Sequence, residues 1–220
     1  IDSVDEELLD AMRRSGCRRI YYGLESASQP ELNRLNKQLA VETVRKNIAL
    51  TRRQGIRTLG FFLTGTPGET RATVQSKVAF AIALKLDYVQ FSKLTAKPLT
   101  AFWRALVRET GSDYWREYIL GNAAERALPR PWTALTNDEI DALTRAAYLR
   151  FHLRPGFLLR ALLEVRGFTE LMRKARALLA MVFRQERIST ADTRFQAFNE
   201  NRPDRVARYR LAVLSRPEPR

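Results

Sequence analysis

The first hundred residues alternate between two patterns of hydrophobic and polar positions. Apolar residues spaced three and four apart predict helices over 5–15 and 41–54, and a third that starts after Thr70 and runs to about residue 82. Thr70 is a residue type that caps helix N-termini. Runs rich in β-branched and aromatic residues predict three strands between these helices, at 19–24, 58–63 and 87–91.

The order of these elements predicts a parallel sheet. Strands that alternate with helices through short connections are typically parallel and joined by right-handed crossovers. The apolar run in 58–63 is nearly continuous, as expected for a strand buried on both faces. We therefore predict the α/β class, with residues 1–100 forming about half of a six- or eight-stranded (β/α) barrel. Three strands cannot close a barrel, so the sheet is expected to be partial.

The second half of the chain is predicted to be helical throughout. After Lys97–Thr100 only helical periodicity remains, at 101–110, 113–120, 137–150, 156–165 and 168–185. We expect a helical extension over 101–187 and a loosely ordered basic tail over 188–220, where charge rises and periodicity fades. The helix at 168–185 has an apolar stripe and a basic side. This pattern suits a packing helix, but also a helix on a membrane surface or a partner.

Composition and charge narrow the class of protein. Hydrophobic residues make up 45% and charged residues 28% of the 220, an ordinary balance for a folded chain. No apolar run reaches the roughly 18–20 residues of a spanning helix. The single cysteine, Cys17, excludes an internal disulfide and a zinc or iron–sulfur site built from this chain's own thiolates. The net charge of +14 is spread along the chain, and nucleic-acid binding is not the expected role.

Polar residues and glycines follow the predicted strands. In parallel α/β barrels, ligands bind where the strands end. Glu25 and Ser26 follow the first strand, and a carboxylate with a hydroxyl suits an ammonium group or ribose hydroxyls. The loop 65–69 follows the second strand, and its two glycines would let backbone amides and carbonyls approach a flat ligand such as a purine. A plainer interpretation is that these glycines only turn the chain and that Glu69 offsets the positive end of the next helix.

Together these motifs resemble a known family. The segment 1–100 resembles the second half of the catalytic barrel of radical S-adenosylmethionine (radical SAM) enzymes, most closely the cobalamin-binding, magnesium-protoporphyrin-cyclase-like branch. The resemblance continues to about residue 185 through a tyrosine- and arginine-rich stretch at 147–155. The motifs that carry it in the first hundred residues are Gly16-Cys17, Gly23-Leu24-Glu25-Ser26, Leu35-Asn36-Lys37, Gly55-Ile56, Gly65-Thr66-Pro67-Gly68-Glu69-Thr70 and Asp87.

The resemblance implies an enzyme that uses S-adenosylmethionine and a [4Fe–4S] cluster, with cobalamin in some members. The implied chemistry is radical or methyl transfer on a small-molecule substrate. It carries no catalytic residue and no metal ligand onto this chain. The cofactor-binding residues that it does imply are Glu25 and Ser26 after the first strand, and Gly65, Pro67, Gly68 and Glu69 in the second loop.

The family's cluster-binding CxxxCxxC loop has no counterpart here. The resemblance therefore implies that the cluster ligands lie in a missing N-terminal part of the same protein. We expect a cytoplasmic fragment that is inactive alone. One motif departs from the family, because Pro98-Leu99-Thr100 stands where members often have Pro-Gly-Thr, and leucine disfavours a positive φ.

Two other hypotheses remain open from the sequence. One is a basic α/β-plus-helical module that binds nucleic acid or makes peripheral contact with an anionic membrane, with binding that weakens steeply as salt rises. The other is a different barrel enzyme that uses Glu25 and Glu69 as acid and base, which requires their carboxyl groups to lie within roughly 5–10 Å. Cys17 and the lone His152 are expected to be structural.

Overall fold

The computed structural model describes residues 4–123 and 128–163, and beyond them only 165, 167, 169, 172–176 and 179. The chain divides into two compact units. The first joins Ile1–Leu94 with Arg130–Val182, and the second contains Thr95–Pro129. The segment 130–182 thus groups with the sheet. The predicted domain boundaries at 100 and 187 stay a prediction, and the predicted tail 188–220 lies outside the described residues.

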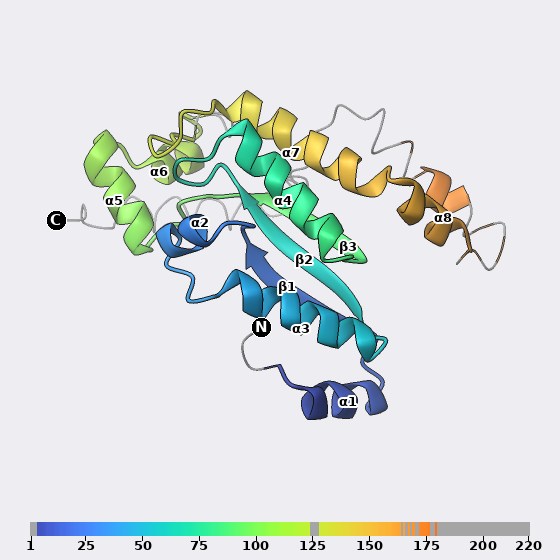
Figure 1. Ribbon diagram of the computed structural model, residues 1–220. Helices are drawn as coiled ribbons and strands as arrows, with labels where there is room; N and C mark the ends of the chain where they lie inside the picture. The colour runs from blue at the N-terminus through green and yellow to red at the C-terminus, as the bar shows by residue number, and fades with distance from the viewer. Residues whose placement is uncertain are drawn as a thin grey trace, which may run out of the picture. The chain divides into compact units, whose positions relative to one another are not determined.

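The first unit contains a three-stranded parallel sheet in the order β1-β2-β3 (Figure 1). Tyr21 of β1 pairs with Leu59 of β2, which pairs with Tyr88 of β3. Helices connect consecutive strands, which confirms the predicted α/β class with parallel strands of a partial barrel, followed by helices. The strands are β1 (Arg19–Glu25), β2 (Arg57–Thr64) and β3 (Tyr88–Lys93).

The helices predicted for this unit before residue 166 form with ends shifted by a few residues, whereas the helix predicted over 168–185 lies largely outside the described residues. Thr70 caps α4 by accepting a hydrogen bond from the Thr73 N–H, as the sequence predicted. The short helix α2 was not predicted. The helices are α1 (Glu6–Arg14), α2 (Gln29–Arg34), α3 (Val41–Arg53), α4 (Arg71–Ala83), α7 (Asn137–His152) and α8 (Pro155–Leu163).

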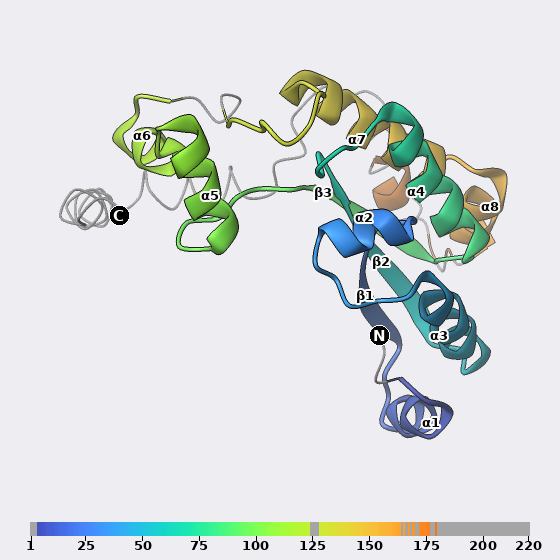
Figure 2. The same ribbon diagram turned by 60° about the vertical axis from the view of Figure 1, so that its left-hand side comes forward.

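The hydrophobic core lies on one face of the sheet, the face that α3, α4 and α7 cover (Figure 2). Phe62 at the centre of β2 is fully buried and stacks on Phe91 of β3, with ring centroids 5.5 Å apart. The alternate side chains Leu59, Phe61 and Leu63 are only half-buried. The expectation that this strand is buried on both faces is therefore wrong for this chain, because helices cover only one face of the described sheet.

The described part of the second unit is helical, as predicted. It contains α5 (Ala101–Thr110) and α6 (Tyr114–Leu120), and Gly111 ends α5 with a φ of +67°. The indole N–H of Trp103 donates to Asp113, which also caps α6. Before α5, Leu99 adopts a φ of +70°, so the Pro-Leu-Thr turn takes the strained conformation without a glycine. Within the part of the chain that the structure describes, no helix is long and apolar enough to cross a membrane.

Candidate functional site

The two predicted binding loops leave the sheet at the same edge. Strands β1 and β2 are parallel neighbours, so the turn at Glu25–Ser26 and the loop at 65–69 both follow carboxyl ends at that edge. Lys93 ends β3 there and pairs with Asp141 of α7 across 2.8 Å. The carboxyl edge thus gathers a carboxylate, a hydroxyl and a glycine-bearing loop from different strands, which is the arrangement by which parallel sheets build ligand sites.

The end of β1 is a strained turn that presents a carboxylate. Glu25 has a φ of +62°, the register with β2 shifts at this point, and the Ser26 N–H donates to the Leu24 carbonyl across 2.7 Å. The Glu25 carboxylate pairs with Lys37 at 3.2 Å and keeps a fifth of its side chain exposed. Non-glycine residues at positive φ cost about 1–3 kcal/mol and concentrate at functional sites. The strained turn therefore supports Glu25 as a binding residue.

Gly23 leaves space for this carboxylate. A β-carbon at Gly23 would lie 3.0 Å from the Glu25 Oε1 atom and 3.4 Å from the Lys37 Nζ atom. A side chain at position 23 would therefore require the carboxylate and the ammonium to shift slightly. The glycine lets the Glu25–Lys37 ion pair lie directly against the backbone of β1.

The loop after β2 is bound within the chain. Gly65 and Gly68 both have φ of +70°, a conformation that favours glycine. The Gly65 N–H donates to the Glu69 carboxylate, the Gly65 carbonyl accepts from the Trp132 indole at 2.8 Å, and the Gly68 N–H donates to the Trp132 carbonyl at 3.1 Å. The sequence suggested that backbone groups of this loop could contact a purine. In the structure these three groups are already hydrogen-bonded within the chain. Pro67 between them is half-buried.

A buried ion-pair cluster lies behind both loops. Its members, Glu31 of α2, Glu69 of the loop and Lys77 of α4, expose between 0 and 6% of their side chains. The Lys77 ammonium donates to Glu31 at 2.5 Å, to the Leu63 carbonyl at 2.8 Å and to Glu69. Glu31 also accepts from the Ser26 hydroxyl at 2.6 Å and from the Thr66 hydroxyl. We call Glu31, Glu69 and Lys77 the buried cluster.

Hydrogen bonding and charge offset the burial of Glu31. Burial alone raises the pKa of its carboxyl, but the Lys77 charge and the hydrogen bonds from Lys77, Ser26 and Thr66 outweigh this, so that the pKa lies below its ordinary value of 4.5. The carboxylate is therefore ionised at neutral pH despite its burial. Buried charges persist only when paired and hydrogen-bonded in this way.

The sequence predicted part of this arrangement. Ser26 donates to the buried cluster and Glu69 belongs to it, whereas Glu25 pairs with Lys37 instead. Glu31 and Lys77 were missed. A signal for Lys77 was present, because it lies among the inward-facing positions of α4, which include Val74, Val78 and Ala81. A lysine in such a stripe indicates a buried partner.

The geometry argues against acid–base catalysis by Glu25 and Glu69 and against metal binding by the described residues. The Glu69 side chain is fully buried and its two oxygens accept from Lys77 and Gly65, which leaves it unsuited to act with Glu25 as an acid–base pair. Cys17 is half-buried, with its sulfur 3.6 Å from the Arg19 carbonyl. Among the described residues, no group of three or more His, Cys, Asp or Glu side chains is placed to hold a metal ion. With one cysteine, the chain does not fit a cubane cluster.

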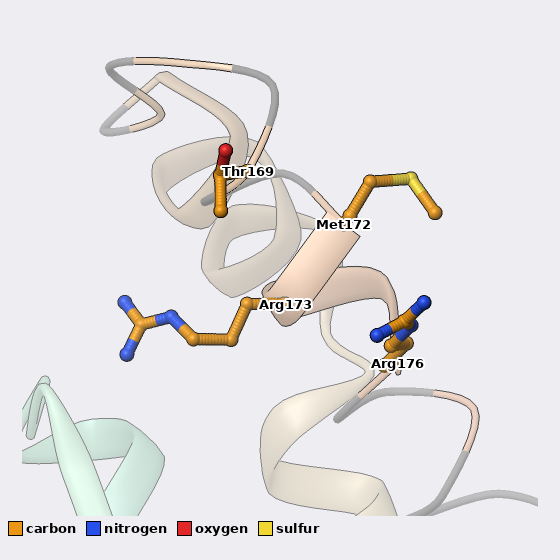
Figure 3. A pocket seen from close by; sticks show the side chains of 4 residues that line it. All are labelled: Thr169, Met172, Arg173 and Arg176. Atoms are coloured by element: carbon orange, nitrogen blue, oxygen red, sulfur yellow. The ribbon is translucent and has the colours of Figure 1, made fainter.

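A separate hollow lies on the helical segment 172–176 (Figure 3). Thr169, Met172, Arg173 and Arg176 line it. The guanidinium groups of Arg173 and Arg176 point to opposite sides of the segment. Because its charged groups do not converge, this hollow lacks the arrangement of a ligand site.

Comparison with known proteins agrees with the resemblance seen in the sequence. Residues 2–81 match the family model of the Radical SAM superfamily. An uncharacterized methyltransferase of Pyrococcus horikoshii is 30% identical over 185 residues, which cover 83% of this chain and 39% of the relative. The anaerobic magnesium-protoporphyrin IX monomethyl ester cyclase of Rubrivivax gelatinosus is 28% identical over 102 residues, 46% of this chain and 18% of the cyclase. The chain therefore spans much less than two thirds of these relatives.

Solved radical SAM structures also match parts of the chain. The methyltransferase TsrM of Kitasatospora setae, solved with cobalamin and a [4Fe–4S] cluster, is 28% identical, with a TM-score of 0.46, over 49% of this chain and 20% of TsrM. The coproporphyrinogen III oxidase HemN of Escherichia coli is 15% identical, with a TM-score of 0.48, over 69% of this chain and 30% of HemN.

Proposed function

We propose that this chain supplies the S-adenosylmethionine-binding edge of a radical SAM enzyme that transfers a methyl group to a small-molecule substrate. Its match to the superfamily and its similarity to the archaeal methyltransferase support the class of chemistry. The observation that carries the proposal is the meeting of the Glu25–Ser26 turn and the 65–69 loop at one sheet edge, where the strained Glu25 carboxylate remains partly exposed.

The contacts of the site residues support the role proposed for each. In this proposal the Glu25 carboxylate accepts hydrogen bonds from an ammonium group or from ribose hydroxyls. Ser26 donates to Glu31, so it acts by fixing the turn rather than by facing a ligand. Gly65, Pro67, Gly68 and Glu69 shape the second wall, with Glu69 holding the loop from behind. When bound, S-adenosylmethionine supplies the group that is transferred.

The residues of this chain cannot bind an iron–sulfur cluster on their own. A [4Fe–4S] cluster is held by about four ligands, mainly thiolates, and the chain has one cysteine. In this proposal the ligands of the cluster come from elsewhere in the enzyme. Cobalamin, the N-terminal part as a partner and the cytoplasmic location remain predictions from the family resemblance.

The proposal is tested by titrating the full 220-residue chain with S-adenosylmethionine and following backbone amide shifts by NMR. We expect saturable shifts at Gly23, Gly65 and Gly68. Glu25→Gln should weaken binding about tenfold, since hydrogen bonds to a charged group contribute about 1.5–3 kcal/mol. Glu42→Gln, an exposed glutamate in the first turn of α3, is the matched control and should leave the affinity unchanged.

Two results would contradict the proposal. One is a wild-type chain that shows no saturable shifts at the carboxyl edge. The other is an equal affinity of wild type and Glu25→Gln, which would remove Glu25 from the binding site.

A further inference from the structure

We propose that Lys77 is the positioning residue of the carboxyl edge, a buried ammonium that fixes the two binding loops relative to each other. This inference rests on the proposed function, because it assigns Lys77 a role toward the S-adenosylmethionine site. Its structural part, the ordering of the two loops by one cation, is independent of any ligand.

The contacts of Lys77 use its full donor capacity. An ammonium group has three N–H donors, and the three acceptors around Lys77 belong to different elements: Glu31 of α2, Glu69 of the loop and the Leu63 carbonyl of β2. Lys77 itself extends from α4. One side chain therefore connects four parts of the fold in a region where water does not reach, since Lys77 exposes none of its side chain.

The two carboxylates extend this connection to both loops. Glu31 accepts from the Ser26 hydroxyl in the turn after β1 and from the Thr66 hydroxyl in the loop after β2. Glu69 accepts from the Gly65 N–H at the start of the same loop. The Ser26 hydroxyl in turn accepts from the Ser28 N–H at 3.0 Å. The two predicted cofactor loops thus share one anchor.

The charges explain why the ordering of both loops depends on Lys77. Two carboxylates meet at one ammonium, so removing the cation leaves like charges in contact without the group that holds them together. The donors Ser26, Thr66 and Gly65 cannot replace it, because none of them carries the positive charge that offsets the two carboxylates. We therefore expect the loops to separate or loosen first when Lys77 is lost.

The test measures amide hydrogen exchange by NMR in the full chain, far below the unfolding midpoint. Lys77→Met should speed exchange of the Gly65 and Ser28 amides at least tenfold, because these N–H groups depend on the anchored loops. Val78→Ala is the matched control, as Val78 is the next residue of α4 and is equally buried. It should lower the unfolding midpoint without a selective effect on these two amides.

A second variant separates positioning from stability. Lys77→Met combined with Glu31→Gln and Glu69→Gln removes the buried charges, so the unfolding midpoint should return toward that of the wild type. The Gly65 and Ser28 amides should still exchange at least threefold faster than in the wild type, because no ammonium joins α4 to the loops. This variant also carries the test if Lys77→Met alone does not fold.

The same samples are then titrated with S-adenosylmethionine. We expect the triple variant to bind at least threefold more weakly than the wild type. Unchanged exchange at Gly65 and Ser28 in the lysine variants, or an equal change in Val78→Ala, overturns the role of Lys77. If the wild type binds no S-adenosylmethionine while exchange responds as expected, the proposed function fails and Lys77 remains the anchor of the loops.

Discussion

Among the four non-glycine residues with a positive φ in the described part of the chain, Glu25 and Leu99 contrast most clearly. Glu25 combines the strained backbone with a partly exposed carboxylate, an ion pair and a register shift in the sheet. Leu99 combines it with an exposed apolar side chain. Strain that is tied to a polar group at a sheet edge is a functional signal. At Leu99 the strained residue has an apolar side chain, which offers no group for binding or catalysis.

This difference predicts that Leu99→Gly stabilises the second unit. Glycine adopts a φ of +70° without the steric cost of a β-carbon, and the gain should be about 1 kcal/mol after the entropy that glycine adds to the unfolded chain. Denaturant unfolding followed by the fluorescence of Trp103 and Trp115 measures it. Leu99→Ala keeps the β-carbon and should stay close to the wild type. A glycine variant no more stable than the alanine variant would contradict the prediction.

The residues of the candidate site were predictable when they belong to local motifs. Glu25, Ser26 and the glycines of the second loop follow strands in a recognisable order, so spacing alone brought them to one edge. Lys77 and Glu31 are 46 positions apart, and their pairing depends on how α2 and α4 pack behind the loops. Sequence periodicity places a residue on a face of its own helix, but it does not say which polar partner faces it across the core.

Among the described helices, the long periodic segments were predicted well and the shortest, α2, was missed. Helices α3, α4, α5 and α7 each span ten or more residues and repeat their apolar positions over several turns. Helix α2 has six residues, which is too few for a hydrophobic period to be recognised. Its buried residues include both Leu32 and the charged Glu31, so its face toward the core is half polar.

The end of α7 predicts a pH dependence of folding stability. His152 packs against the rings of Tyr148, Phe151 and Phe157, with centroids 5.0–5.8 Å away. Burial lowers the pKa of His152 below 6.5, and the nearby Arg154 charge lowers it further, although the contact with the Tyr148 carbonyl raises it. The unfolded chain therefore binds a proton at a higher pH than the folded one, and stability falls as the pH drops below about 6.5.

Denaturant unfolding between pH 7.5 and 5 measures this effect. His152→Gln, which does not titrate, should flatten the dependence over this range. The carboxyl of Glu31, whose pKa also lies below its ordinary value, should cause a second loss of stability in both proteins only below about pH 4.5. An equal slope for the wild type and His152→Gln between pH 7.5 and 5 would show that His152 does not contribute.

In the molecule as a whole, the sequence predicted the class of fold and a partial sheet of three strands, but not which faces of that sheet are covered. The alternation of helices and strands was enough to predict three parallel strands. The same pattern suggested that β2 is buried on both faces, whereas Leu59, Phe61 and Leu63 are half-buried on a face that the described helices leave uncovered. An apolar run indicates that both faces of a strand are suited to burial. It does not indicate which elements cover each face.

The sulfur content of the chain leads to a prediction for its metal chemistry. A [4Fe–4S] cluster requires about four ligands, and thiolates provide most of them in proteins. The chain has Cys17 alone, in a half-buried position beside the Arg19 carbonyl. Anaerobic reconstitution of the 220-residue chain with iron and sulfide should therefore give no stable iron–sulfur absorbance and much less than one cluster per chain.

The control is Cys17→Ser taken through the same reconstitution, which should give the same residual iron as the wild type. A stable, stoichiometric cluster on the wild type that disappears in Cys17→Ser would mean that this thiolate recruits ligands, for example from other copies of the chain. That outcome would contradict the proposal that the cluster is held elsewhere in the enzyme. Because S-adenosylmethionine titration of the cluster-free chain tests Glu25 separately, the cofactor edge and the cluster can each be supported or rejected independently.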